Sequence, residues 1–142
     1  MRYLGLDLGS RTLGMALSDR SGILATSYKT IRHNEEYDKL VEEVKLVVDS
    51  EDVDAIVLGF PKNMDNSVGT KAELSISFKS KLESLILKDV YLEDERLTTK
   101  IATDFLIGAN VSRKKRKGVV DSMAATVILQ AFLDKRRNNE EK

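Results

Sequence analysis

The residues best suited to chemistry are carboxylates that lie in or beside apolar segments. Asp7 lies inside the apolar run Tyr3–Leu8, although aspartate is depleted in strands and an unpaired charge is costly in apolar surroundings. Asp94 and Glu95 end a later apolar segment, and Asp121 precedes the last one. Converging carboxylates repel one another, and a bound divalent cation removes that repulsion. The pattern predicts a cation-dependent site anchored on Asp7; the alternative for each acid is a helix cap or a solvated strand end.

Five consecutive basic residues lie shortly before Asp121. A run of this kind is usually a solvated loop, but beside an acidic site it can hold the phosphates of a polyanionic substrate. Two bound cations at such a site can activate a water and stabilise the leaving oxygen of a phosphodiester. No aromatic residue interleaves with the run, so base stacking there is not indicated. The run consists of Arg113, Lys114, Lys115, Arg116 and Lys117.

A second candidate for phosphate binding is the polar loop that starts at Gly59 and leads into a predicted helix near Gly69. Its Lys62, Asn63 and Ser67 could hold a phosphate together with the N-terminus of that helix. An ordinary capped loop explains the same residues equally well.

The composition limits the classes of function. Zero net charge, from 23 basic and 23 acidic residues, means that nucleic-acid binding would need local segregation of charge. Cysteine is absent, which excludes disulfides and thiolate sites and fits a reducing cytosol. His33 is the one histidine, so a histidine-based metal cluster is excluded. We expect His33 in an exposed loop or at a helix start.

The apolar patterns predict an α/β domain. Strands are predicted at residues 2–9, 13–19, 23–31, 54–59 and 90–94, and helices at 37–48, 69–87, 98–108 and 119–133. Three strands followed by alternating helices and strands indicate a mixed sheet with helices on its faces. In open α/β sheets, ligands bind beyond the carboxyl ends of the parallel strands. Asp7 and the end of the segment 90–94 would meet there, and Asp121 joins them if the last helix packs across that edge.

The length of 142 residues suggests a single domain with one proper core. We expect that domain to span residues 1–135, followed by a disordered tail over residues 136–142. No apolar run approaches the roughly 20 residues of a membrane helix, and a predicted strand stands where a secretory signal would lie. The sequence therefore predicts a cytoplasmic protein without a membrane partner.

Four motifs occur in order along the chain. They are Asp7-Leu8-Gly9-Ser10 with Leu13-Gly14-Met15-Ala16, then Gly59-Phe60-Pro61-Lys62-Asn63-Met64-Asp65, then Asp94-Glu95-Arg96-Leu97-Thr98-Thr99, and finally Val120-Asp121 with Ala124-Ala125 and Ile128-Leu129. Together they resemble the YqgF/RuvX family, over a stretch from Tyr3 to about Phe132. Members of this family are bacterial proteins described as Holliday junction resolvases and as nucleases for the 5′-end maturation of pre-16S ribosomal RNA.

The resemblance implies an RNase H-like fold, with a five-stranded mixed sheet of order 3-2-1-4-5, an antiparallel second strand and helices on both faces. It implies that Asp7, Glu95 and Asp121 form a metal-binding acidic triad for two Mg²⁺ or Mn²⁺ ions. The choice of Glu95 over Glu93 or Asp94 depends on the Asp-Glu-Arg match.

The implied partner is nucleic acid, either precursor ribosomal RNA or branched DNA, bound by a monomer or a homodimer. Two departures from the family pattern are Arg11-Thr12, where a Lys-Arg pair is usual, and Asn66, where a glycine is usual. The residues expected to contact the nucleic acid are Arg11, Lys62, Asn63, Arg96, Arg113, Lys114, Lys115, Arg116 and Lys117.

Two other functions fit parts of the pattern. The chain could be a non-catalytic module that binds nucleic acid or the ribosome, with vestigial acids. It could also belong to the ATP-binding actin-like kinases, in which an Asp-x-Gly hairpin cradles metal and phosphate. Length argues against this last interpretation, because those proteins need two such domains and 142 residues supply one.

Overall fold

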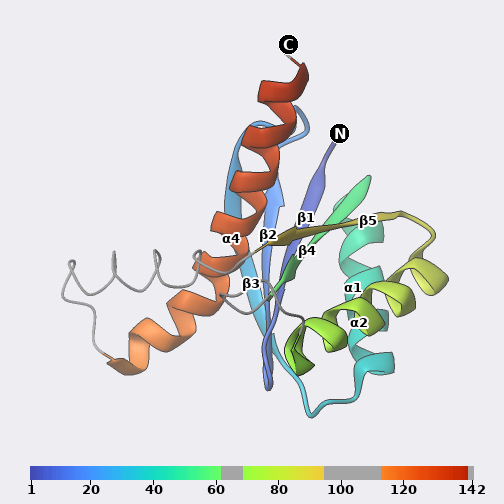
Figure 1. Ribbon diagram of the computed structural model, residues 1–142, viewed down its shortest axis with the longest axis vertical. Coiled ribbons are helices and arrows are strands. Elements are labelled where there is room, and N and C mark those ends of the chain that lie inside the picture. Colours follow the sequence, from blue (N-terminus) through green and yellow to red (C-terminus); the bar gives the residue numbers. More distant parts are fainter. Residues whose placement is uncertain (62–68, 95–112, 141–142) are drawn as a thin grey trace.

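The computed structural model describes the backbone of residues 1–61, 69–94 and 113–140, and their side chains except those of 113–122 and 138–140. The predicted helix at 98–108 lies outside these ranges. Five strands and three helices are described (Figure 1): β1 (Tyr3–Leu8), β2 (Thr12–Ser18), β3 (Ala25–Arg32), α1 (Tyr37–Ser50), β4 (Ala55–Phe60), α2 (Thr70–Ile86), β5 (Asp89–Asp94) and α4 (Arg113–Glu140).

The strands form one mixed sheet of order β3-β2-β1-β4-β5. Strand β2 runs antiparallel to β1 and β3, whereas β1, β4 and β5 are parallel. Helices α1 and α2 cover one face of the sheet and α4 covers the other (Figure 1). The predicted fold class, strand order and antiparallel second strand are therefore confirmed.

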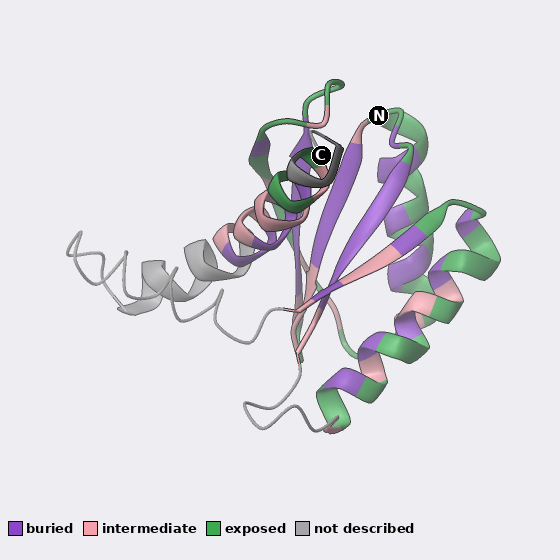
Figure 2. Cartoon of the chain, turned by 45° about the horizontal axis from the view of Figure 1, so that its top comes forward, coloured by how far each residue is buried: buried purple, intermediate pink, exposed green. Residues whose placement is uncertain are grey.

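Each face of the sheet carries its own buried core (Figure 2). Successive residues of a strand point to opposite faces, so Leu4 and Leu6 of β1 pack under α1 and α2 whereas Tyr3 packs under α4. Helix α1 supplies the matching apolar stripe, with Leu40, Val41, Val44, Val47 and Val48 buried at helical spacing. This alternation determines which strand residues can reach the α4 side.

Helix α4 packs very closely on the central strand at Gly5. A Cβ atom at Gly5 would lie 2.8 Å from Cβ of Leu129 and 3.1 Å from the carbonyl oxygen of Ala125. Two residues earlier in β1, on the same face of the sheet, the ring of Tyr3 contacts that of Phe132 edge-on, with ring centroids 5.6 Å apart. The missing side chain at Gly5 thus sets the distance between helix and sheet.

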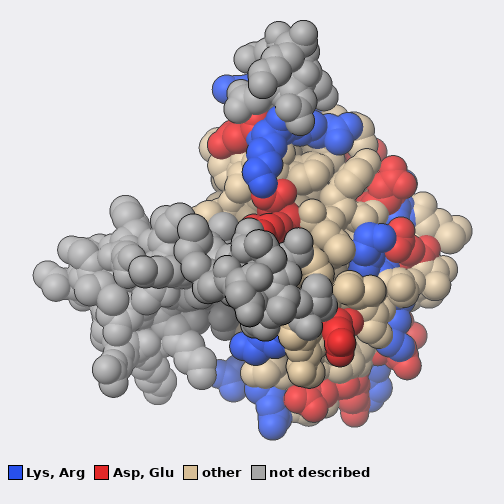
Figure 3. Space-filling model, viewed as in Figure 1, with Lys and Arg blue, Asp and Glu red and all other residues tan. Residues whose placement is uncertain are grey.

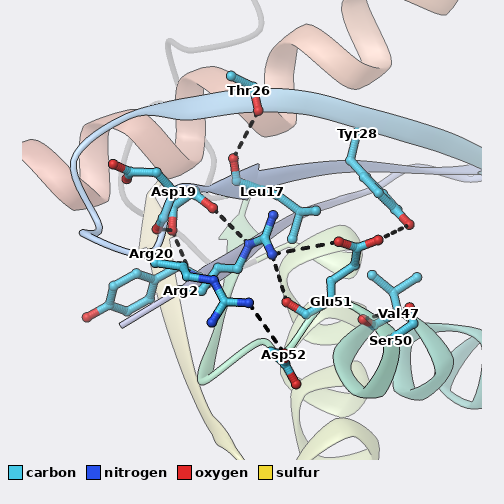
Figure 4. Close-up of polar contacts among 12 residues, drawn as sticks. Arg2, Leu17, Asp19, Arg20, Thr26, Tyr28, Val47, Ser50, Glu51 and Asp52 are labelled. Atoms are coloured by element: carbon cyan, nitrogen blue, oxygen red, sulfur yellow. Dashed lines mark hydrogen bonds and ion pairs between the residues drawn. The ribbon is translucent and has the colours of Figure 1, made fainter.

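Arg2 anchors the amino end of β1 to two other elements (Figure 4). Its Nε donates to the carbonyl oxygen of Ser18 at 3.1 Å, and its Nη1 donates to that of Glu51 at 3.0 Å. The backbone N–H of Arg2 also donates to Oδ2 of Asp54 at 2.8 Å. The Glu51 carboxylate accepts a further bond from the hydroxyl of Tyr28 at 3.2 Å. The start of β1 is therefore held to the end of β2 and the end of α1.

The last helix is longer than predicted at both ends. It starts at Arg113 rather than near residue 119, because lysine and arginine are strong helix formers and one internal glycine, Gly118, costs only about 1 kcal/mol. The basic run therefore lies in the first turns of α4 and not in a loop. Asp121 lies about two turns into the helix, so the interpretation of Asp121 as a helix cap is wrong.

At its other end α4 continues to Glu140, although the sequence predicts a disordered tail over residues 136–142. Residues 141 and 142 lie outside the described ranges. Among the helices in those ranges, none has the length and apolar character needed to cross a membrane.

Gly5→Ala tests the close contact between helix and strand. Replacing glycine in a strand gains up to about 1 kcal/mol of backbone entropy, but overpacking a tight contact costs about 1–3 kcal/mol. We expect a net loss of about 1–2 kcal/mol in the free energy of unfolding, measured by urea denaturation. Thr30→Ala on the exposed edge strand is the control, with an expected change within about 0.5 kcal/mol. An unchanged unfolding midpoint for Gly5→Ala would contradict this account.

Candidate functional site

Asp7 lies on the α4 face of the sheet, at the carboxyl end of the central strand. Tyr3 and Gly5 of β1 contact α4, and the alternation of strand residues puts Asp7 on the same face. Asp7 is half-buried, and its cross-strand partner in β2 is Gly14, which has no side chain. The predicted anchor of the acidic site therefore lies where the α4 core meets the edge of the sheet.

Helix α4 runs past β1 in the opposite direction. Tyr3 contacts Phe132, and Gly5 faces Leu129 and Ala125. Two strand residues span about 6.6 Å and four helical residues about 6 Å, so each step of two along β1 matches a step of four along α4. Two residues further along β1, Asp7 therefore lies level with the segment 121–125 of α4. Asp121 belongs to that segment, and its side chain lies outside the described residues.

The third predicted acid, Glu95, lies outside the described ranges, directly after the end of β5. The parallel ladders align Leu6 with Leu58 and Leu58 with Leu92, so the carboxyl ends of β1, β4 and β5 lie at one edge. Strand β5 is two strands from β1, or about 10 Å. Strand β5 thus ends, at Asp94, on the edge that also carries Asp7.

Glu93 is a buried acid on the same face whose charge is already paired. Only 6% of the residue is exposed, and its Oε1 accepts a short hydrogen bond from Nζ of Lys135 in α4. Its neighbour Tyr91 packs on Phe132 with centroids 5.3 Å apart. The sequence offered Glu93 as an alternative middle acid, but it contained no local signal for the partner Lys135, which lies far along the chain.

The turn between β1 and β2 is tied down by His33. Within the turn the N–H of Gly9 donates to the carbonyl oxygen of Thr12 at 2.8 Å. The backbone N–H of His33 donates to the carbonyl oxygen of Arg11 at 2.9 Å, and its ring Nε2 lies 2.9 Å from that of Gly9. The sequence predicted His33 in an exposed loop or at a helix start. His33 does lie in the loop between β3 and α1, but it is half-buried, and this contact was not predicted.

The ring of His33 also lies against Tyr37, the first residue of α1, with centroids 5.7 Å apart. Burial, and then the negative charge of Glu35, raises the pKa of Tyr37 above its ordinary value. The Tyr37 hydroxyl therefore stays protonated at neutral pH.

The basic candidates are only partly described. Arg11 is exposed in the β1–β2 turn. The run 113–117 forms the first turns of α4, and the helical rise puts it about 6–12 Å along the axis from position 121. Lys62, Asn63 and Arg96 lie outside the described ranges. On the face shown in Figure 3, acidic and basic side chains of the described residues are interspersed. In the sequence, the run 113–117 is the longest stretch of consecutive basic residues.

Within the described ranges, no group of three His, Cys, Asp or Glu side chains is arranged to hold a metal ion. The described part of the predicted triad is Asp7, since the side chains of Glu95 and Asp121 fall outside it. The structure thus brings Asp7, the early turns of α4 that contain Asp121 and the end of β5 at Asp94 to one edge of the sheet.

Several known proteins resemble this chain over nearly its whole length. The family model RuvX, described as Holliday junction resolvase, matches residues 1–135. A protein of Geobacillus sp. (strain WCH70), named "Putative pre-16S rRNA nuclease", is 50% identical over 138 residues, which cover 96% of this chain and 100% of that protein. A protein of the same name from Bacillus cereus (strain AH187) is 48% identical over 141 residues, with the same coverage of both chains.

Two solved structures share the fold. RuvC of T. thermophilus in complex with a Holliday junction substrate aligns with a TM-score of 0.59 at 15% identity, over 96% of each chain. A second Thermus thermophilus RuvC structure gives 0.57 at 14% identity, over 97% of each chain. At this identity the likeness concerns the fold, and it confirms the RNase H-like architecture. The family match over residues 1–135 and the relatives at about half identity show that this chain belongs to the RuvX family.

Proposed function

We propose that this protein is a metal-dependent nuclease that hydrolyses phosphodiester bonds in the 5′-end processing of pre-16S ribosomal RNA, with Holliday junctions as the second substrate to test. The observation that carries the proposal is the position of Asp7: half-buried at the carboxyl end of β1, on the face covered by α4. That helix contains Asp121. The names of the relatives and the description of the family support the choice of substrates.

The three acids have separate roles in this proposal. Asp7 and Asp121 are cation ligands, and Glu95 is a further ligand or orients the attacking water. Carboxylate oxygens are hard donors of the kind that Mg²⁺ and Mn²⁺ prefer, so the donor set fits these cations. Two such ions would supply an activated water and stabilisation of the leaving oxygen. The protein contributes a central strand and a helix packed closely on it at Gly5, which would hold Asp7 and Asp121 on the same side of the sheet.

The basic run 113–117 is proposed to hold the phosphate backbone of the substrate. Cations at a helix N-terminus oppose the helix dipole, so this placement does not favour helix stability. A bound polyanion compensates both the cations and the positive end of the dipole. The other contacts proposed for the nucleic acid are Arg11, Lys62, Asn63 and Arg96.

Asp7→Asn and Asp121→Asn should each reduce cleavage by about 100-fold or more, because each variant removes a charge that the reaction needs. The purified variants are assayed with Mn²⁺ and with Mg²⁺ on precursor 16S ribosomal RNA, four-way DNA junctions and unbranched single strands. Urea denaturation should show that both variants remain folded, and EDTA should abolish wild-type cleavage.

Unchanged cleavage by pure, folded Asp7→Asn protein would contradict the nuclease proposal. Wild-type protein that binds these substrates in EDTA but cuts none of them would instead indicate a non-catalytic binding module.

Neutralising the basic residues 113–117 should weaken substrate binding and reduce its dependence on salt. The slope of log affinity against log salt concentration should fall by roughly 0.7–0.9 for each phosphate that the variant no longer neutralises.

The pair between buried Glu93 and exposed Lys135 allows a structural acid to be told apart from the proposed middle acid of the site, Glu95. Because Lys135 already neutralises Glu93, we expect Glu93→Gln to cleave within about threefold of wild type and Glu95→Gln to lose about 100-fold. Lys135→Ala leaves a buried carboxylate unpaired and should cost about 1–2 kcal/mol of stability. Glu93→Gln in the Lys135→Ala background should recover part of that loss.

Arg20→Ala is the matched control for Lys135→Ala. It breaks the pair Arg20–Asp52, which spans 3.5 Å between two side chains that are each about three-quarters exposed, and such pairs contribute at most about 1 kcal/mol. Loss of cleavage in Glu93→Gln together with normal cleavage in Glu95→Gln would reverse the assignment of the middle acid.

A further inference from the structure

The ring of His33 joins two backbone segments by its two nitrogens. Nε2 lies 2.9 Å from the carbonyl oxygen of Gly9, in the turn that follows Asp7. Nδ1 accepts a hydrogen bond of 3.0 Å from the backbone N–H of Glu35, in the loop that leads to α1. Since both partners are backbone groups, the bridge does not depend on their side chains.

The two partners fix the protonation of the ring. The N–H of Glu35 can only donate, so Nδ1 must be the bare acceptor nitrogen. The carbonyl oxygen of Gly9 can only accept, so Nε2 must carry the hydrogen. The two contacts thus assign the hydrogen to Nε2 and the acceptor role to Nδ1, so both ring nitrogens are in use.

The two hydrogen bonds of the His33 ring lie just beyond the end of the β1–β2 ladder. Pairing between β1 and β2 stops at Leu8 and Leu13, so the carbonyl of Gly9 lies beyond the ladder. The backbone N–H of His33 reaches the same turn at Arg11. A Cβ at Gly9 would lie 3.2 Å from both the carbonyl oxygen and Oγ1 of Thr12, which shows how tightly the turn closes. His33 therefore ties this turn to the β3–α1 loop through both its ring and its backbone N–H.

We propose that His33 is a positioning residue of the nuclease site. Its Nε2–H holds the Gly9 carbonyl, and through it the carboxyl end of β1 and the start of the turn that carries Arg11. The inference depends on the proposed function, because Asp7 and Arg11 act on substrate only if the protein is a nuclease. A displacement of about 1 Å at a reacting group can cost roughly 100-fold in rate, so a short backbone tether can matter as much as a direct contact.

Two amide variants separate the roles of the two ring nitrogens. The amide nitrogen of glutamine in His33→Gln replaces the Nε2–H donor, and the amide oxygen of asparagine in His33→Asn replaces the Nδ1 acceptor. We expect His33→Gln to cleave within about threefold of wild type. His33→Asn and His33→Ala should lose about 10–100-fold in kcat, the loss typical when a residue that orients a metal ligand is removed. KM should change by less than about threefold.

The neighbouring exposed residue supplies the control: Asn34→Ala alters the same loop without altering the bridge and should cleave like wild type. If His33→Asn cleaves like wild type, or if His33→Gln loses as much as His33→Asn, the positioning role is wrong. The second pattern would instead assign the ring to packing of the β3–α1 loop, where it contacts Tyr37.

Amide hydrogen exchange of residues 9–12 tests the tether without any cleavage. Exchange in this turn should accelerate in His33→Asn and His33→Ala and stay at the wild-type rate in His33→Gln, with global stability measured in parallel. Unchanged exchange in His33→Asn and His33→Ala would overturn the inference. If wild-type protein cleaves no substrate while exchange follows the expected pattern, the proposed function fails but the tether stands, so the two failures are distinguishable.

Discussion

The structure depends most on the close packing of α4 against the central strand at Gly5. Because no side chain intervenes, Ala125 and Leu129 come within contact distance of the β1 backbone. This contact aligns helix and strand in opposite directions, and the alignment brings the early turns of α4 to the carboxyl end of β1. The same contact that fills the α4 core thus determines how far position 121 lies from Asp7, so the stability of the fold and the geometry of the proposed site share one interaction.

Charge is distributed in two ways around this edge of the sheet. Glu93 is buried and neutralised by Lys135, so it can contribute to packing without a metal. Asp7 is half-buried near the edge, and in the proposed site its charge is balanced by cations that are part of the reaction. The basic residues at the start of α4 would then offset the charge of the substrate. In the proposed site, a protein with zero net charge would bind nucleic acid through this local run of positive charge and not through its overall charge.

Local patterns in the sequence predicted the elements, and the family motifs predicted their order. Alternation in β1 and the apolar stripe of α1 depend on neighbours within a few residues, so they could be recognised directly. The start of α4 was missed because the run 113–117 suits both a solvated loop and a helix. The pairs Glu93–Lys135 and His33–Gly9 were missed because each joins residues that only the folded chain brings together. For the candidate site, the candidate acids could therefore be named from the sequence. The partner of Glu93 and the contact of His33 with the β1–β2 turn could not.

In the proposed site Asp7 and Asp121 bind one cation together, and Mn²⁺ affinity measured by electron paramagnetic resonance tests this most directly. Titrations of wild type, Asp7→Asn, Asp121→Asn and the double variant form a double-mutant cycle. If the two carboxylates share an ion, each single variant weakens binding and the double variant is little weaker than either one. Independent losses whose free energies add in the double variant, or an unchanged Mn²⁺ affinity in Asp7→Asn, would contradict the shared site.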